Sequence, residues 1–424
     1  MSARAMTESE AGSANVAIPP RSFLLAAALF LTIASTNILT PLLPDIRTDF
    51  GVSIATAGLI VGAYGLARLL TDLPAGLLAH RIGHRRLCLT AVVLLVASSF
   101  LGLGATSVEA LIVARIGSGA AVAILATVIL AALAATAVAT NRGKVMSLYH
   151  VANNTGIAIY PLIGGVIGVA MGWRTTFVVT IVLALLAGAI LVPALPHMDP
   201  RGRAAERATR PAPRVLHGPT RAVALTATNF GVLANMINRH GFRNTILPLY
   251  AATALGLGGI SIATAIALMS ITGLFVATPG GMLGDRIGRR RVITTGLAAL
   301  AVGDLVFLLT GDLVTFLLAA ALIGFGDFFA SSQTALLSEI VPPEQRTRVL
   351  GGYRFSADLG AFLGPVILAT VMDVANAQAA IVAAVAILLS ASFAARFGVP
   401  ATVDARVAPL AGPPPLEGAL DGPS

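Results

Sequence analysis

Long runs of apolar residues alternate with short polar segments along the whole chain. Twelve runs are close to the length of about 20 residues that a helix needs to cross a bilayer. They cover residues 22–43, 53–79, 87–105, 109–138, 145–169, 175–195, 221–252, 260–283, 292–310, 313–340, 349–372 and 377–397. A polar stretch at 196–220, with five arginines, divides them into six and six. The pattern predicts an all-α membrane protein of twelve transmembrane helices, with six-helix bundles at 22–195 and 221–397 joined by a linker.

The composition agrees with a membrane protein. Only 11% of the 424 residues are charged and 56% are hydrophobic, whereas soluble domains carry about 25% charged residues. Basic loops on one side of a membrane explain the net charge of +9 better than nucleic acid does. The single cysteine, Cys88, excludes an intramolecular disulfide and lies among apolar residues. We therefore expect no metal, no cofactor and no nucleic-acid partner.

The distribution of basic residues predicts the orientation. The linker and every second loop hold most of the arginines and lysines, whereas the remaining loops hold only Arg47 and Arg174. The basic side is expected to be cytoplasmic, with both termini inside, in a plasma or inner membrane. Residues 1–21 lack the apolar core of a secretory signal and form a cytoplasmic tail in this interpretation. Residues 398–424, rich in proline, alanine and glycine, are predicted to be a disordered tail.

The two halves repeat each other. The segment "PAGLLAHRIGHRRL" (74–87) recurs as "PGGMLGDRIGRRRV" (279–292), with a separation of 205 residues. The segment 142–165 resembles 346–369 in the same way, with a separation of 204 residues. Parallel repeats of this kind place a binding site near the middle of the bilayer, between the halves.

These motifs resemble those of the major facilitator superfamily over nearly the whole chain. The repeated loop is similar to the hallmark loop between helices 2 and 3 and between helices 8 and 9. "ARIGSGAAVA", which begins at Ala114, "TPLLPDI" at residues 40–46, and "GIAIYPLIGG" at 156–165 resemble motifs of twelve-helix drug/proton antiporters, although Tyr160 stands where the last motif usually has glycine. The resemblance implies two six-helix bundles that give alternating access to a central cavity.

The resemblance also implies roles for particular residues. A cytoplasmic gate would include Gly76, His80, Arg81, Gly83 and Arg85 of the first loop, and Gly281, Asp285, Arg286, Gly288 and Arg289 of the second. A helix-bend motif would include Gly156, Pro161, Gly164, Gly165, Gly360 and Pro365. Because His80 replaces the aspartate of the family loop, the latch of the first half is expected to be weaker, and Asp72 is expected to take over by reaching Arg354.

Four charged residues on helices 2 and 11 extend the predicted gate. Arg68 and Asp72 are spaced i, i+4, and so are Arg354 and Asp358. Helices 2 and 11 face each other in the family, so we predict a crossed cluster in which Asp72 pairs with Arg354 and Arg68 with Asp358. The cluster would close the cytoplasmic side in the outward-open state. Two separate intrahelical pairs without a gating role are the alternative.

Polar residues on cavity-lining helices predict the transport site. The candidates are Asn37, Arg115, Asn153, Asn235, Arg239, Arg243 and Asp327. A buried carboxylate near an arginine can change its proton occupancy when substrate enters, so we assign proton coupling to Asp327, paired with Arg239 or Arg243. The alternative is a static salt bridge. Asp304 is expected to have a structural partner, and Arg115 either a structural role or one in proton relay.

These features predict a secondary transporter that exports small organic molecules in exchange for protons. The chain has no nucleotide-binding loop and no HExxH or GxSxG motif, which argues against an enzyme. A proton-coupled importer of a sugar or organic acid, or a non-transporting sensor, are the alternatives. Helix 1 has no acid before Asp45, and helix 7 carries arginines, so neutral or anionic substrates are favoured. We expect a monomer that is driven by the proton gradient.

Overall fold

The chain folds into helices joined by short loops. The structure is a computed structural model that describes residues 18–138, 141–195, 216, 218–342 and 345–400, and these residues contain no strand. The first half contains α2 (Pro20–Asn37), η1 (Thr40–Leu42), α3 (Leu43–Phe50), α4 (Ile54–Ile82), α5 (His84–Leu103), α6 (Val108–Thr136), α7 (Arg142–Met171) and α8 (Thr175–Ala194). The second half contains α9 (Gly218–Met236), η3 (Ile237–Ile246), α10 (Leu247–Ala254), α11 (Gly259–Ile287), α12 (Arg289–Val306), η4 (Phe307–Leu309), α13 (Leu313–Gly326), η5 (Asp327–Phe329), α14 (Ala330–Glu339), α15 (Arg346–Val374) and α16 (Ala377–Gly398).

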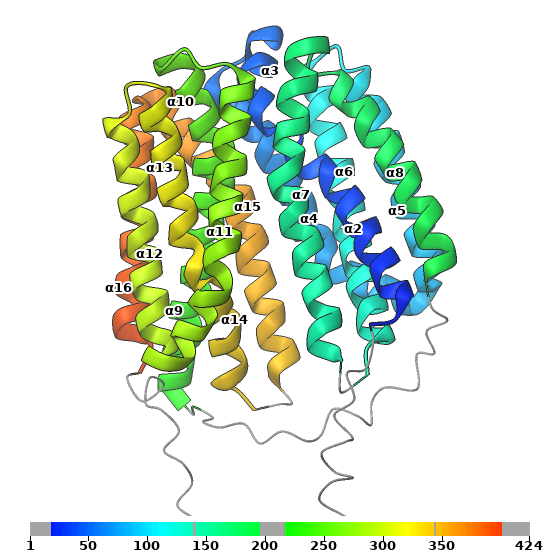
Figure 1. Ribbon diagram of the computed structural model, residues 1–424, viewed down its shortest axis with the longest axis vertical. Coiled ribbons are helices and arrows are strands. Elements are labelled where there is room, and N and C mark those ends of the chain that lie inside the picture. Colours follow the sequence, from blue (N-terminus) through cyan, green and yellow to red (C-terminus); the bar gives the residue numbers. More distant parts are fainter. Residues whose placement is uncertain (1–17, 139–140, 196–215, 217, 343–344, 401–424) are drawn as a thin grey trace, which may run out of the picture.

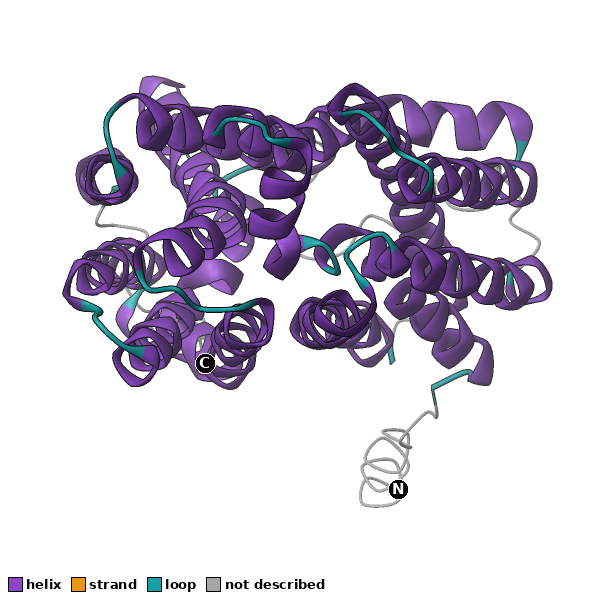
Figure 2. Cartoon of the chain, turned by 90° about the horizontal axis from the view of Figure 1, so that it is seen from above, coloured by secondary structure: helices purple, strands orange, loops and turns teal. Residues whose placement is uncertain are grey.

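Each half has its own hydrophobic core. One cluster of buried side chains comes almost entirely from α2 to α8, and a second comes almost entirely from α9 to α16. Many of these side chains are alanines, which allow transmembrane helices to approach closely. Figures 1 and 2 show the two groups of helices side by side. The outer faces expose large apolar side chains such as Phe275, Leu309 and Phe397, as expected for surfaces in contact with lipid.

The helices are long and apolar enough to cross a membrane. Eleven segments within the described residues meet this condition, so the chain is an integral, multi-pass membrane protein. The predicted span 221–252 is not among them because α9, η3 and α10 share it and polar side chains interrupt its apolar surface. The prediction of an all-α membrane fold is confirmed, but the seventh span is three elements rather than one helix.

The two ends of the bundle differ in chemistry. Ser53, Ser107, Asp312 and Asn376 cap the N-termini of α4, α6, α13 and α16 with side-chain acceptors. We call this end, at the top of Figure 1, the capped end. The other end, the arginine-rich end, holds the corners between α4 and α5 and between α11 and α12.

Glycine forms both of these corners. Gly83 has φ 85° and Gly288 has φ 99°, values that side chains with a Cβ rarely adopt. Each glycine ends one helix and begins the next, which explains why the repeated loop keeps glycine in both copies. The linker 196–220, apart from Leu216 and residues 218–220, lies outside the described residues, as do residues 1–17 and 401–424 of the tails.

A candidate transport site between the two halves

The halves contact each other mainly near the capped end. The backbone N–H of Ile54 on α4 donates a hydrogen bond to Asp373 Oδ1 on α15, at 3.2 Å. Farther along α4, Gly65 lies so close to α15 that a Cβ there would be 2.6 Å from the carbonyl carbon of Ala361. On the other side of the interface, a Cβ at Gly165 of α7 would lie 3.0 Å from the carbonyl oxygen of Gly259 on α11. The capped end is therefore closed.

These close contacts add a packing role to the predicted helix-bend motif. Helices α7 and α15 continue through Pro161 and Pro365 without interruption. A Cβ at Gly164 would lie 1.9 Å from the carbonyl oxygen of Ile38, and one at Gly360 would lie 2.6 Å from that of Leu233. The glycines of the motif thus allow close helix packing, which transmembrane interfaces obtain from small residues.

A pocket lies at the interface on the inner side of this closure. It is lined by Thr36, Leu39, Thr40, Leu43, Ile46, Ile60, Val61, Tyr64 and Arg115 of the first half, and by His240 and Asn244 of the second. The hydroxyls of Thr36 and Tyr64 are hydrogen-bonded at 2.6 Å. Arg115 and His240 supply the cationic or titratable groups, and no carboxylate is among the lining residues described.

Arg115 is held firmly inside the first half. Its side chain extends from α6, and the residue is 5% exposed. Its Nη1 donates to the carbonyl oxygen of Ser35 at 2.7 Å, and its guanidinium carbon lies 4.7 Å from the ring centroid of Tyr64. The guanidinium therefore joins three helices and also reaches the pocket. This geometry agrees with a structural role and leaves room for contact with a ligand.

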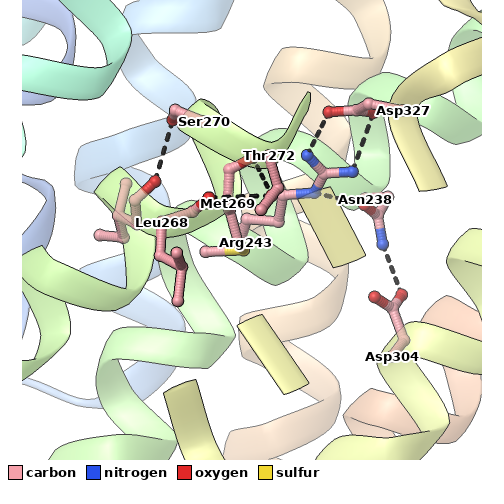
Figure 3. Close-up of polar contacts among 9 residues, drawn as sticks. Asn238, Arg243, Leu268, Met269, Ser270, Thr272, Asp304 and Asp327 are labelled. Carbon is pink, nitrogen blue, oxygen red and sulfur yellow. Dashed lines mark hydrogen bonds and ion pairs between the residues drawn. The ribbon is translucent and has the colours of Figure 1, made fainter. Parts of the chain in front are cut away.

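A second polar group, entirely within the second half, surrounds Arg243 (Figure 3). Arg243 Nη1 lies 2.6 Å from Asp327 Oδ2, and Nη2 lies 3.0 Å from Asp327 Oδ1. Paired parallel bonds of this kind are strong and directional. The Arg243 side chain is 7% exposed and that of Asp327 is 17% exposed. Of the two predicted partners of Asp327, the structure places Arg243 in contact.

Local backbone geometry explains how Arg243 is placed. Residues Ile237–Ile246 form a π-helix, a conformation often found at functional sites, and Thr245 Oγ1 donates to the carbonyl oxygen of His240 five residues earlier. In this segment Asn238 Oδ1 accepts a 2.9 Å hydrogen bond from Arg243 Nε, although the two residues are also five apart. Asp327 begins the 3₁₀ turn η5, which interrupts the predicted span 313–340. Both charged partners therefore extend from irregular turns.

Asn238 continues the network to a third element. Its Nδ2 donates to Asp304 Oδ2 on α12. Asp304 is completely buried. The expected structural partner of Asp304 is thus Asn238, an asparagine that was not among the predicted site residues.

The predicted cavity residues do not form one group. Only Arg115 of the seven lines the pocket, and Arg243 and Asp327 form a separate pair. Asn37 and Asn235 are buried, Asn153 is half-buried beside Asn154, and Arg239 is half-buried on η3. Four lining residues were not predicted, because hydrophobic runs do not show which face of a helix meets the opposite half: Thr36, Tyr64, His240 and Asn244.

The charges on α4 and α15 form only part of the crossed cluster. Arg68 Nε lies 3.3 Å from Asp358 Oδ1 across the halves, and Arg68 Nη2 lies 3.9 Å from Asp72 Oδ2 on its own helix. The described residues show no ion pair between Asp72 and Arg354. Arg354 is exposed. The cluster is predicted for the state in which the arginine-rich end is closed, whereas here the capped end is closed, so the pairing of Asp72 with Arg354 stays a prediction. Helices α4 and α15 still contact each other at Gly65, one turn before Arg68, whereas Arg354 lies farther toward the arginine-rich end.

The second copy of the charged loop is tied to its own half. Arg289 pairs with Asp285 of α11 and, at 3.2 Å, with Glu339 of α14. The His80 side chain lies outside the described side chains, so the weaker latch of the first half stays a prediction. At the positions 205 residues earlier, the first half has His80 and His84 instead of Asp285 and Arg289. The chain thus lacks a second copy of this ion pair.

Comparison with known proteins identifies the class. A family profile described as the Major Facilitator Superfamily matches residues 25–242 and 228–419. The chain belongs to the major facilitator superfamily and is a transporter of small molecules, not an enzyme. This agrees with the two bundles and with the pocket at their interface.

Individual relatives point to the drug-export branch. The chain is 27% identical over 366 residues to a chloramphenicol resistance protein of Streptomyces lividans, which covers 84% of this chain and 90% of the relative. It is 30% identical over 294 residues to the cephamycin export protein CmcT of Amycolatopsis lactamdurans, covering 68% of this chain and 55% of that relative.

Solved structures agree in fold. A bacterial homologue of the human lysosomal transporter Spinster, in an inward-facing and unoccupied conformation, has a TM-score of 0.72 at 16% identity, covering 90% of this chain and 98% of the other. The human organic anion transporter MFSD10 has a TM-score of 0.65 at 16% identity, covering 89% and 100%. Identities this low establish the fold alone.

Proposed function

We propose that the protein exports small organic molecules in exchange for protons, by alternating access. The arginine-rich end is assigned to the cytoplasm by the positive-inside rule, so the closed capped end faces outward in this proposal. The names of the chloramphenicol resistance and cephamycin export relatives support export.

The observation that carries the proton-coupling proposal is the Arg243–Asp327 pair. Its two parallel hydrogen bonds, of 2.6 and 3.0 Å, stabilise an ionised carboxylate that is mostly buried but still 17% exposed. Charged groups inside a membrane protein are costly and are usually functional or paired. When a proton binds Asp327, the attraction to Arg243 is lost, and the turns η3 and η5 that carry them are released from each other. A movement of η3 reaches the substrate pocket, because His240 of the same π-helix lines it.

The pocket supports neutral or anionic substrates. Its polar lining consists of hydroxyls, an amide, Arg115 and His240, and it has no carboxylate to attract a cation. The remaining lining is aliphatic, as in most small-molecule sites. The Thr36–Tyr64 pair and the guanidinium of Arg115 provide donors for a carboxylate, carbonyl or nitro group. That the structural neighbour MFSD10 is named an organic anion transporter is consistent with this.

Transport in proteoliposomes tests the proposal. The wild-type chain and the Asp327→Asn variant are reconstituted, and the flux of radiolabelled chloramphenicol is followed with and without an imposed pH gradient. We expect the gradient to accelerate wild-type flux and to have no effect on the variant. Asp312→Asn is the matched control: it makes the same substitution outside the site, at the N-cap of α13, where asparagine can also cap the helix. A gradient-driven flux that survives in Asp327→Asn would refute proton coupling at this residue, and binding without flux in the wild type would favour a sensor.

A further inference from the structure

Asp304 is a buried carboxyl to which the proposed coupling step gives no role. It lies near the C-terminal end of α12 and is 0% exposed. Its Oδ2 accepts the hydrogen bond from Asn238, while its Oδ1 has no hydrogen-bond partner among the described residues. The described residues place no cation within ion-pair distance of it. An ionised carboxylate without a contacting cation is very unfavourable in such a site, so Asp304 is expected to be protonated in this arrangement.

Asn238 connects Asp304 to the coupling pair. Its oxygen accepts from Arg243 Nε at 2.9 Å, and its nitrogen donates to Asp304. The resulting order, shown in Figure 3, is Asp304, Asn238, Arg243, Asp327. The amide is oriented by both neighbours, because its oxygen must face the cation and its NH₂ must face the carboxyl. Arg243 therefore contacts the carboxylate of Asp327 directly and is connected to the carboxyl of Asp304 through the amide of Asn238.

The charges around this network explain why both carboxyls respond to Arg243. Arg243 and Asp327 act electrostatically on Asp304 from η3 and η5, and Arg239 on η3 acts on Asp327 as a second cation. His240 lies on the same turn. If Asp327 became neutral, Arg243 would keep its charge in a site where its side chain is only 7% exposed. Asp304 is the nearest remaining carboxyl of the network.

We propose that the coupling proton is shared by two carboxyls, Asp327 and Asp304, with Arg243 as their common cation. This rests on the proposed function, since it takes Asp327 as the proton-accepting group. With one proton bound, the network has two arrangements. The proton lies on Asp304 while Arg243 holds Asp327, as in this structure, and it lies on Asp327 while the Asp304 carboxylate stabilises Arg243 through Asn238.

The proton enters and leaves at Asp327, because Asp327 retains exposure and Asp304 has none. When the network unloads, an oxygen of Asp327 gives its proton to cavity water. Both carboxyls are then ionised, with Arg243 between them and Arg239 beside Asp327. Moving the proton from Asp327 to Asp304 requires Arg243 to leave Asp327 so that cavity water can carry the proton, because the Asn238 amide and the guanidinium do not release protons. Once the proton is on Asp304, Arg243 and Asp327 pair again.

Infrared spectroscopy of the purified, full-length protein near neutral pH tests this sharing without any substrate. The probe is the C=O stretching band of a protonated carboxyl. All variants are compared in an Asp358→Asn background, because Asp358 is the other buried aspartate among the described residues. In that background we expect the chain with Asp304 and Asp327 intact to show one such band, which is absent after Asp304→Asn. We also expect the band to be absent from Asp327→Asn, although that variant keeps Asp304, because Asp304 then ionises to balance Arg243. Asp373→Asn, which removes an exposed carboxyl at the capped end, should keep the band.

The outcomes separate the two proposals. A band that persists in Asp327→Asn, or an Asp304→Asn spectrum that matches the Asp358→Asn background, would overturn proton sharing. If Asp304→Asn does not fold, the comparison of Asp327→Asn with that background is sufficient. Asp327→Asn removes an ionised group, and the protonated band can disappear only if another carboxyl loses its proton. Gradient-driven flux in Asp327→Asn would instead overturn the coupling role while leaving the infrared result intact.

Discussion

Replacing Gly65 with alanine should open the capped end. A Cβ at this position of α4 would lie 2.6 Å from the carbonyl carbon and 2.7 Å from the carbonyl oxygen of Ala361 on α15. Optimal contact between carbon atoms is about 3.5–4.0 Å, so the helices must separate by about 1 Å. The obstructing atoms are backbone, and no side-chain rotation relieves the overlap.

The expected cost follows from this overlap. Adding a methyl group to a well-packed contact costs about 1–3 kcal/mol. The cost applies only while the capped end is closed, because the helices part when it opens. A difference of that size lowers the population of the closed state relative to the open state by about 5–150-fold.

Distances between spin labels on α4 and α15 measure this population. Labels on introduced cysteines at Leu59 and Val374 report the capped end, and the native Cys88 is completely buried. Gly351→Ala on α15 is the control, because a Cβ there meets nothing within 4 Å. Both variants gain the same helix propensity. If Gly65→Ala and Gly351→Ala gave the same distance distribution, the closure would not depend on this contact and the reasoning would fail.

Three other perturbations test separate features. Asp373→Asn replaces a charged acceptor by a neutral one and should weaken the 3.2 Å hydrogen bond from the Ile54 N–H across the halves. Hydrogen exchange at the Ile54 amide, measured by mass spectrometry or NMR, should become faster. Phe307→Ala removes a fully buried ring between two other aromatic rings and should lower stability by about 3–5 kcal/mol, whereas Leu309→Ala, 80% exposed, should leave the melting temperature in detergent nearly unchanged. Hydrogen bonds from the backbone of α13 lower the pKa of Asp312, so its capping contribution is complete above the ordinary pKa of about 3.9 and disappears only as the pH falls through the lower pKa of the folded state. The protection of amides in the first turn of α13, relative to their intrinsic exchange rate at each pH, measures this, and protection that is lost at or above the ordinary pKa would contradict it.

The apolar pattern was sufficient to predict most of the fold. Every predicted run corresponds to helical structure, because the requirement to span a bilayer fixes both length and composition. The predicted helices ended too early at the arginine-rich end. Helix α7 begins at Arg142 instead of 145, and α11 continues to Ile287 instead of ending at 283. These turns carry basic residues, which end an apolar run in sequence but can still be helical.

The site was less predictable, for two physical reasons. The pairing of Asp327 with Arg243 rather than Arg239 depends on the π-helical turn, and a pattern based on α-helical spacing does not place Asn238 and Arg243 together. The pocket residues Tyr64 and Thr36 belong to apolar runs whose faces toward lipid and toward the other half are equally hydrophobic. The structure was needed to distinguish these faces.

The π-helix Ile237–Ile246 makes the transport site sensitive to the number of residues in this segment. Insertions and deletions are usually harmless in loops and disruptive in helices, yet here the wider turn accommodates more residues than α-helical spacing would. If the same residues wound as an α-helix, five steps of about 100° each would place Arg243 about 140° around the helix axis from Asn238 instead of on the same side. Every residue named in the transport site would still be present, but the guanidinium would point away from Asp327. The residue count of this segment is therefore itself a determinant of the site.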